Sequence, residues 1–415
     1  MNLSEQIRKI PPYIKLGSLG VLFSFVLGIC FPSIKDWLTA TEQPPTALRI
    51  NKPQDGQQVQ TDAFSVHLFQ YYLSKVPEGN LTIMPDTASQ CLTALKSKAF
   101  PETTALFTPL QICERKTQSS AEITEAACLF TNAKDTIPQS AENSIVYPAP
   151  FSEDIVSALQ TVNNTIYGVS NRSVSHMFSS TTAPHTTCIL AATVIDFKPD
   201  WYYPIRAEQT KPNKFRNADG SRSEVPFMQA NGRFRIADDP QGRWKAVAMF
   251  MRNTPQGDAA GHDSCALILI QPQTNGTPGA RPLAAALTTT DYNSIRTALA
   301  TAEEKPATIN LPRIYNMETR LDMRLIPVLQ DLGLGAITEP NAAPFPGLSA
   351  TAPFPLSGFI QHSRVSFVES PASAVAPTEV TTVDSPIDFD RPFIWMLCPL
   401  TAPEPPYLMG VIEFM

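Results

Sequence analysis

Two apolar runs near the C-terminus decide the fold of this chain: Ile387-Asp388-Phe389-Asp390-Arg391-Pro392-Phe393-Ile394-Trp395, and then Tyr407-Leu408-Met409-Gly410-Val411-Ile412. Within the first stretch, the acidic-basic-Pro-Phe cluster Asp390-Arg391-Pro392-Phe393 leads into the apolar residues. A Pro-rich turn over residues 401–406 separates this stretch from the second. Short apolar runs bounded by turn residues are typical of strands that are covered on both faces. The sequence therefore predicts a buried β-hairpin at the end of a domain.

Local patterns predict two helices near the start of the same domain. The first should follow Thr61 or Asp62, either of which can cap it, because apolar residues repeat at helical spacing after them. A short strand should then break at Pro85 into a second helix, which Asp86 or Thr87 can cap.

Three further elements are predicted along the chain. The nearly continuous apolar run over residues 187–197 indicates a central strand, because only a strand covered on both faces lacks polar alternation. An Asp219-Gly220 pair indicates a hairpin turn. A helix should begin near Leu325, with Pro327 in its first turn, and end at Gly333. Residues 99–150 show little periodicity.

The C-terminal hairpin resembles the signature of the serpins, in which a D-R-P-F turn enters one core strand and F-M-G-x-V forms the next. Other segments resemble serpin motifs in the same order, with a partial match at the first of them. These are Asn80-Leu81-Thr82-Ile83-Met84-Pro85-Asp86-Thr87-Ala88-Ser89, Phe197-Lys198-Pro199-Asp200-Trp201, Asp219-Gly220 followed by Val225-Pro226-Phe227-Met228, and Phe345-Pro346-Gly347-Leu348-Ser349.

The resemblance covers residues 61–415 and implies one mixed α/β unit of serpin type. Such a unit has three β-sheets, about eight or nine helices and an exposed reactive loop. The expected function is inhibition of an extracytoplasmic serine endopeptidase by a monomer. The alternative is a non-inhibitory binding or scaffold protein with the same fold.

Composition argues against other classes of function. A net charge of -6 is unlike that of a nucleic-acid-binding protein, which carries a basic excess. The five histidines, at positions 67, 176, 185, 262 and 362, form no metal-ligand spacing with one another or with cysteine. HExxH, GxSxG and Gly-rich phosphate motifs are also absent from the sequence. We therefore expect neither an enzyme nor a cofactor or metal.

The seven cysteines lack paired spacing. Three of them lie inside apolar runs and are expected to be buried hydrophobic residues: Cys188, Cys265 and Cys398. One disulfide among Cys91, Cys113 and Cys128 stays open as an alternative.

The N-terminus has the pattern of a targeting element. A tail over residues 1–15, carrying Arg8, Lys9 and Lys15, precedes an uncharged apolar run over residues 16–34. About 19 residues just span a bilayer as a helix, and the basic flank predicts that the following chain is exported. A signal anchor is favoured over a cleaved signal peptide, which would give a secreted protein. Residues 35–60 should be a linker.

The resemblance places the reactive loop directly before the C-terminal hairpin. It implies that a protease cleaves this loop, whose N-terminal half then inserts into the main sheet as a new strand. The loop is Ser370, Pro371, Ala372, Ser373, Ala374, Val375, Ala376, Pro377, Thr378, Glu379, Val380, Thr381, Thr382 and Val383, and it continues to Pro386.

Small side chains in the first half of the loop suit insertion, whereas two features depart from the inhibitory pattern. The usual hinge Gly becomes Pro371 or Ala372, and Pro377 would remove a ladder hydrogen bond from an inserted strand. Thr381 and Thr382 are the candidate scissile region. Since the loop has no Arg or Lys, an elastase-like protease is favoured over a trypsin-like one.

The resemblance also implies a shutter, the point at which the main sheet opens to admit the loop. His362 is expected to steady it, and Thr193 stands where the family has an Asn.

Overall fold

A computed structural model of the protein describes residues 63–96, 123–132, 145–180, 189–251, 265–273, 279–321, 329, 335–338, 355–372, 374, 386–400 and 405–415. All of these belong to one compact unit, Ile50–Met415. The predicted basic tail, membrane segment and linker lie outside the described residues, as does most of the helix expected near Leu325. No helix in the described ranges is long and apolar enough to cross a membrane.

A five-stranded sheet forms one part of this unit. Its strand order is β10-β11-β4-β2-β3, with β4 parallel to β11 and antiparallel to β2. The bounds are β2 Ile123–Asn132, β3 Val146–Ala149, β4 Ile189–Phe197, β10 Ile314–Leu321 and β11 Leu356–Phe367. The predicted central strand is thus confirmed as β4, in which every residue except Asp196 is buried.

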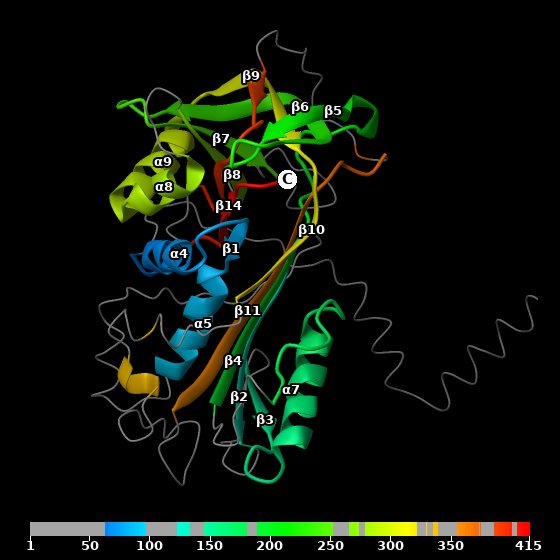
Figure 1. Ribbon diagram of the computed structural model, residues 1–415, viewed down its shortest axis with the longest axis vertical. Helices are drawn as coiled ribbons and strands as arrows, with labels where there is room; N and C mark the ends of the chain where they lie inside the picture. The colour runs from blue at the N-terminus through cyan, green and yellow to red at the C-terminus, as the bar shows by residue number, and fades with distance from the viewer. Residues whose placement is uncertain are drawn as a thin grey trace, which may run out of the picture. The chain divides into compact units, whose positions relative to one another are not determined.

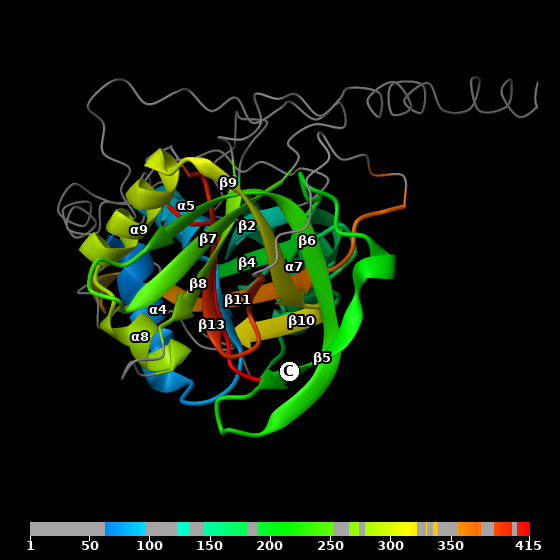
Figure 2. The ribbon, with the colours of Figure 1, turned by 90° about the horizontal axis from the view of Figure 1, so that it is seen from above.

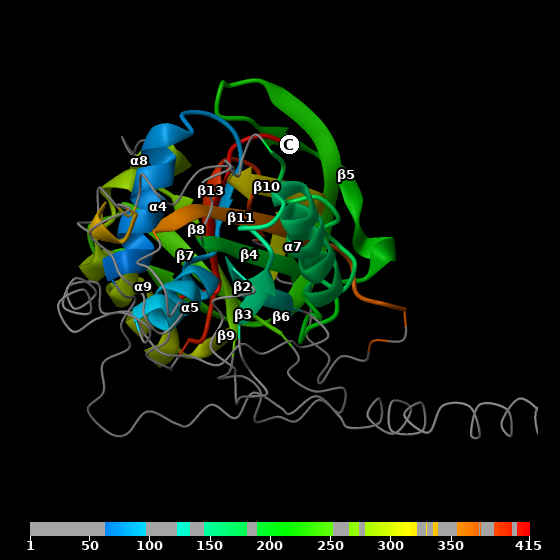
Figure 3. The ribbon, with the colours of Figure 1, turned by 90° about the horizontal axis from the view of Figure 1, so that it is seen from below.

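Two helices cover opposite faces of this sheet, as Figures 1 and 3 show. Helix α7 (Ile155–Val169) packs on one face, where it shares an apolar cluster with Leu190, Ala192 and Val194 of β4. Helix α5 (Pro85–Lys96) packs on the other. It begins at Pro85, one residue before the predicted caps, because Pro fits the first turn of a helix.

A nine-stranded sheet forms the other part, in the order β1-β14-β13-β8-β7-β6-β9-β12, with β5 paired to β6. The bounds are β1 Leu81–Ile83, β5 Lys211–Arg216, β6 Arg222–Asp238, β7 Trp244–Phe250, β8 Ala266–Pro272, β9 Glu304–Pro312, β12 Ile387–Asp388, β13 Phe393–Cys398 and β14 Leu408–Ile412. Figure 2 shows β6 as a long curved strand with β5 alongside it. The hairpin turn between them has Gly220 at a φ of 84°, which confirms the Asp-Gly prediction.

Strand β6 explains why the described strands form two sheets where three were expected. Its first residues pair with β5, its middle with β9 and its last four with β7. Two of the three expected sheets are therefore continuous through one shared strand.

The remaining described helices are α4 (Ala63–Lys75), α8 (Ala280–Ala286), α9 (Thr289–Thr301) and the short 3-10 helices η2 (Ala207–Gln209) and η5 (Gly335–Thr338). Five α-helices thus have bounds within the described ranges, which do not test the number expected for the whole chain. Helix α4 begins directly after the predicted capping residues.

The predicted C-terminal hairpin is confirmed. Strand β13 pairs with β14 on one side and β8 on the other, and β1 covers the far edge of β14. All residues of both hairpin strands are buried. Burial of two adjacent strands on both faces places this hairpin in the core of the domain.

The described cysteines are buried thiols. Cys265 and Cys398 are buried as predicted, whereas Cys188 lies outside the described residues. Cys91 and Cys128 are buried free thiols as well. The Cys91 thiol lies 3.9 Å from the carbonyl oxygen of Cys128 rather than bonded to its sulfur. Among the described residues, the alternative of a Cys91–Cys128 disulfide is therefore wrong, while Cys113 lies outside them.

Candidate functional site at the exit of strand β11

Strands β4 and β11 form the centre of the five-stranded sheet and bond directly to each other. Their parallel register runs from Ile189 opposite Leu356 to Phe197 opposite Val365. No other strand lies between them along this length. The sheet is therefore closed at the place where a further strand would have to enter.

The chain leaves the sheet just after Phe367, the last residue of β11, and two interactions fix its exit. The Trp201 indole Nε1, which is buried, donates a hydrogen bond of 2.7 Å to the carbonyl of Val368. Ser370 and Ile205 then bond reciprocally: the Ser370 N–H donates to the Ile205 carbonyl at 2.9 Å, and the Ile205 N–H donates to Ser370 Oγ at 3.0 Å.

Glu369, which lies between Val368 and Ser370 in the sequence, adds a charged contact. Its Oε1 accepts a hydrogen bond of 2.8 Å from Thr210 Oγ1 and lies 3.3 Å from Nη1 of Arg313, which stands between β9 and β10. The side chain of Glu369 is only 14% exposed, whereas that of Arg313 is 42% exposed. Ion pairs with one exposed partner contribute roughly 0–1 kcal/mol, so this contact positions the exit more than it stabilises the fold.

The first described residues of the predicted loop lie outside the sheet. The Ala374 N–H donates to the carbonyl of Pro371 at 2.9 Å, which makes a local turn, and Arg206 Nη1 lies 3.4 Å from the Ala372 carbonyl. We call the contacts of residues 368–374 with residues 201–210 and 313 the hinge contacts. Ser373 and residues 375–385, which include Pro377 and the candidate scissile pair Thr381 and Thr382, lie outside the described residues.

The structure does not bring the two predicted shutter residues together. Thr193 is fully buried and is the register partner of Gln361, whereas His362 is the partner of Val194. Side chains alternate between the faces of a strand, so Thr193 and His362 lie on opposite faces of the sheet. His362 and Thr193 therefore do not face each other across the two strands, and their role as a shutter stays a prediction.

Gln361, the register partner of Thr193, lies on the α5 face of the sheet. It is 1% exposed, and its Nε2 donates a hydrogen bond of 3.0 Å to the carbonyl of Met84, the residue before helix α5. This bond joins the central strand β11 to the helix beneath it. The alternation of β11 could have located Gln361, because Phe359, Val365 and Phe367 share its parity and belong to the core cluster on that face.

His362 lies on the α7 face and is half-buried among charged residues. Burial lowers the pKa of its imidazole from the usual value, while the carboxylate of Glu318 acts in the opposite direction. Arg364, two residues further along the strand, forms an ion pair with Asp196 of β4. His362 thus belongs to a row of polar side chains that crosses β10, β11 and β4. Among the described residues it takes no part in the hinge contacts.

The described residues offer nothing for a metal, since they contain no group of three His, Cys, Asp or Glu side chains placed to bind one ion. What they do provide is a closed parallel pair of strands followed by a segment held outside the sheet.

The chain belongs to the serpin family. A model of that family, described as serpin (serine protease inhibitor), matches residues 80–402, which is more than half of the chain. Human Serpin B11 is 20% identical over 228 residues, covering 55% of this chain and 54% of the human protein. Plasminogen activator inhibitor 1 of Neovison vison is 21% identical over 253 residues, covering 60% and 59%.

Solved structures agree on the fold. Serine protease inhibitor (serpin)-12 of Manduca sexta superposes with a TM-score of 0.69 at 18% identity, covering 85% of this chain and 97% of the insect chain. Uncleaved ovalbumin superposes with a TM-score of 0.71 at 16% identity, covering 86% and 100%. At such identities the likeness shows the fold alone. The chain spans between half and three fifths of the curated relatives' lengths.

Proposed function

We propose that the protein inhibits a serine endopeptidase by cleavage and insertion of the segment that follows β11. The observation that carries this proposal is the direct parallel pairing of β4 with β11, with Ser370 held outside the sheet by Ile205. A segment that turns back from β11 would run antiparallel to both strands. One parallel ladder would thus be exchanged for two antiparallel ladders, which are slightly more stable per residue.

Insertion has a cost at the exit of β11. The reciprocal bonds between Ser370 and Ile205 would have to break, together with the contacts of Glu369 with Thr210 and Arg313. Exchange of a hydrogen bond within the protein for bonds to water costs only about 0.5–1.5 kcal/mol. The hinge contacts therefore set a barrier to opening without preventing it.

The chemistry of the loop suggests the class of protease. Residues 370–386 contain Ala, Ser, Val and Thr but neither Arg nor Lys. A trypsin-like pocket requires a cationic side chain, whereas a small apolar pocket accepts Thr381 or Thr382. An elastase-like endopeptidase is accordingly the proposed partner.

A second function, that of a binding or scaffold protein, is favoured by one specific observation. Pro371 and Pro377 both lie in the half of the loop that would insert, and each lacks a backbone N–H. Proline is confined to edge strands, first residues and bulges of sheets. Pro371 can be a first residue, so Pro377 is the position at which the two functions diverge.

Incubation of the purified protein with an elastase-like, a chymotrypsin-like and a trypsin-like protease tests the proposal. We expect a covalent complex that survives detergent only with the first, and cleavage close to Thr381. Replacement of Thr381 by Arg should move complex formation to the trypsin-like enzyme. Clean cleavage of the loop by every enzyme without any complex would refute inhibition of these enzymes and favour the binding function.

We also propose that the domain is held outside the cytoplasm by residues 16–34. Support comes from the uncharged run itself and from the basic residues before it, Arg8, Lys9 and Lys15. The full chain should sediment with membranes and resist extraction at high salt, whereas Val21→Asp with Phe25→Asp should release it or block export. Recovery of the intact wild-type chain in a soluble fraction would refute the anchor.

A further inference from the structure

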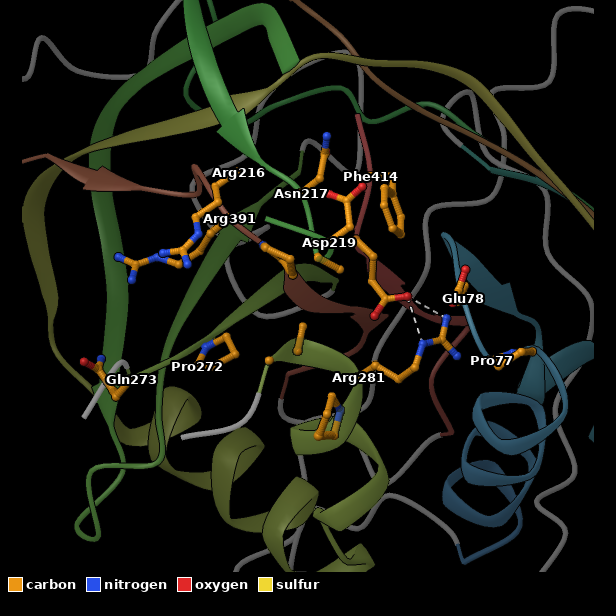
Figure 4. A pocket seen from close by; sticks show the side chains of 16 residues that line it. Pro77, Glu78, Arg216, Asn217, Asp219, Pro272, Gln273, Arg281, Arg391 and Phe414 are labelled. Atoms are coloured by element: carbon orange, nitrogen blue, oxygen red, sulfur yellow. Dashed lines mark hydrogen bonds and ion pairs between the residues drawn. The ribbon is translucent and has the colours of Figure 1, made fainter. Parts of the chain in front are cut away.

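A cavity of about 650 Å³ lies among segments that take no part in the hinge contacts. Its walls come from the segment after α4, the β5–β6 turn, the end of β8, the start of α8 and the two C-terminal segments around residues 391 and 413. Its volume falls in the range of sites for small molecules, roughly 300–1,000 Å³. Figure 4 shows the side chains that line it.

The floor of the cavity is built around Arg281 of α8. Its Nε and Nη2 each lie 2.8 Å from the Glu413 carboxylate, and the two side chains are only 11% and 8% exposed. The same guanidinium donates to the carbonyls of Leu73, Val76 and Gly79. Its charge and donors are thus used within the protein, so the floor is rigid and electrically neutral.

Two other arginines line the cavity, and neither is held by a network of contacts like that of Arg281. Arg216 and Arg391 lie together on one side of it, apart from Arg281 (Figure 4). Their backbones are adjacent, because the Arg216 N–H donates to the carbonyl of Asp390 at 2.7 Å. Among the described residues Arg216 has no ion-pair partner, and Arg391 has only Asp390, 3.4 Å away with both side chains about two-fifths exposed.

Asp390 offsets part of the charge of Arg391, and the other carboxylates at the cavity are engaged elsewhere. Asp219, in the β5–β6 turn, accepts a hydrogen bond of 2.8 Å from the Ser221 N–H, and Glu413 is held by Arg281. Glu78 belongs to the far wall, beside Pro77 (Figure 4). Two guanidinium groups from adjacent segments therefore share one end of a cavity, where an anion would relieve their mutual repulsion.

The other walls are apolar and stiff. They include the rings of four prolines and one phenylalanine, namely Pro77, Pro272, Pro282, Pro392 and Phe414. Proline rings carry no N–H and lose little conformational entropy on contact with a ligand. An apolar cavity with a few convergent polar groups is the usual form of a small-molecule site.

We propose that this cavity binds a small organic anion. A phosphate or carboxylate group would accept hydrogen bonds from Arg216 and Arg391, whose planar guanidinium groups match such anions in geometry. The apolar body of the ligand would lie against the proline-lined wall. Binding requires neither cleavage nor insertion of the loop, so this site is independent of protease inhibition.

Titration calorimetry of the full chain with phenyl phosphate, benzoate and inorganic phosphate tests the proposal. We expect phenyl phosphate to bind at one site, and the double variant Arg216→Gln/Arg391→Gln to weaken it about tenfold or more, as loss of charge-assisted hydrogen bonds predicts. Arg222→Gln is the matched control. Arg222, the register partner of Arg216, does not line the cavity. Its replacement removes one of the two positive charges that the double variant removes, and should change affinity by about twofold or less.

A second variant keeps both arginines and fills the space. Ala218→Trp should block phenyl phosphate by occupying the cavity mouth, with the folded far-UV spectrum retained because Ala218 is exposed. Equal binding by wild type and double variant would overturn the proposal, as would the absence of phenyl phosphate binding in the wild type. Inorganic phosphate that binds as tightly as phenyl phosphate would overturn the role of the apolar wall.

Discussion

The Trp395 indole packs directly over Gly410, its register partner across the C-terminal hairpin. A Cβ atom at position 410 would lie within 2.5 Å of Trp395 Cε2 and 2.6 Å from the Leu81 carbonyl oxygen of β1. Real Cβ contacts are never this short, so the hairpin admits only glycine here. The close approach explains why an otherwise apolar strand carries a single Gly between Met409 and Val411.

Gly410→Ala should accordingly destabilise the protein. The added methyl would push on a buried ring and on backbone, and such overpacking costs about 1–3 kcal/mol or more. Gly168→Ala, at an exposed position of α7, is the control: nothing lies within 4 Å of its added Cβ, and stability should stay equal or rise by up to about 1 kcal/mol. Denaturant unfolding measures both. A Gly410→Ala protein as stable as wild type would contradict the packing described.

Phe393→Ala tests the burial of the other hairpin strand. Phe393 is fully buried, and its ring centroid lies 5.3 Å from that of Phe389. Loss of such a ring from a core costs about 3–5 kcal/mol. Tyr315→Ala is the matched surface control, since Tyr315 is 75% exposed and should contribute within about 0.5 kcal/mol. A loss below roughly 1 kcal/mol for Phe393→Ala would place the hairpin at the periphery.

The hairpin could be predicted because its sequence carries several signals that agree. Turn residues bound both runs, the runs have strand length, and their continuous apolar character matches burial on two faces. Strand β4 was predictable for the same reason. In each case the local pattern and the tertiary environment favour the same element, so nothing in the fold overrides the sequence signal.

The face on which His362 lies could not be predicted as securely, because a shift of one residue along a strand moves a side chain to the opposite face. His362 is a more conspicuous residue than Gln361, yet it shares its face with Ile360 and the α7 cluster. The cavity was missed for another reason. Its arginines come from segments around positions 216, 281 and 391, and only the fold brings these together.

Protonation of His362 should lower stability in mildly acidic solution. Burial lowers the pKa of its imidazole in the folded state below the usual value of 6.5, so the unfolded chain binds more protons as the pH falls through that value. The associated stability is complete above pH 6.5 and is lost toward the lower folded-state pKa. His362→Gln should therefore lose less stability than wild type on transfer from about pH 7.5 to about pH 5.

Thermal unfolding at the two pH values measures this difference. Titration of the many carboxylates affects wild type and variant alike and cancels in the comparison. His67→Gln, which replaces an exposed histidine on α4, is the control for the substitution itself. An identical pH dependence for His362→Gln would mean that this imidazole remains solvated in the folded protein.

The last prediction separates the two proposed functions through the loop. If the cleaved segment inserts between β4 and β11, two new ladders form and the melting temperature should rise well above that of the intact protein. If Pro377 prevents insertion, cleavage should leave the melting temperature almost unchanged, because an inserted proline lacks the N–H for its ladder bond. In that case Pro377→Ala should restore both the rise in melting temperature and the covalent complex with protease.

The control is Pro386→Ala, at the opposite end of the loop. It removes a proline that would not enter the sheet and should restore neither. A wild-type protein that shows the rise and traps protease would prove that Pro377 is tolerated and that inhibition is the function. Failure of Pro377→Ala, combined with clean cleavage, would assign the block to a sheet that cannot open, and the binding function would then stand.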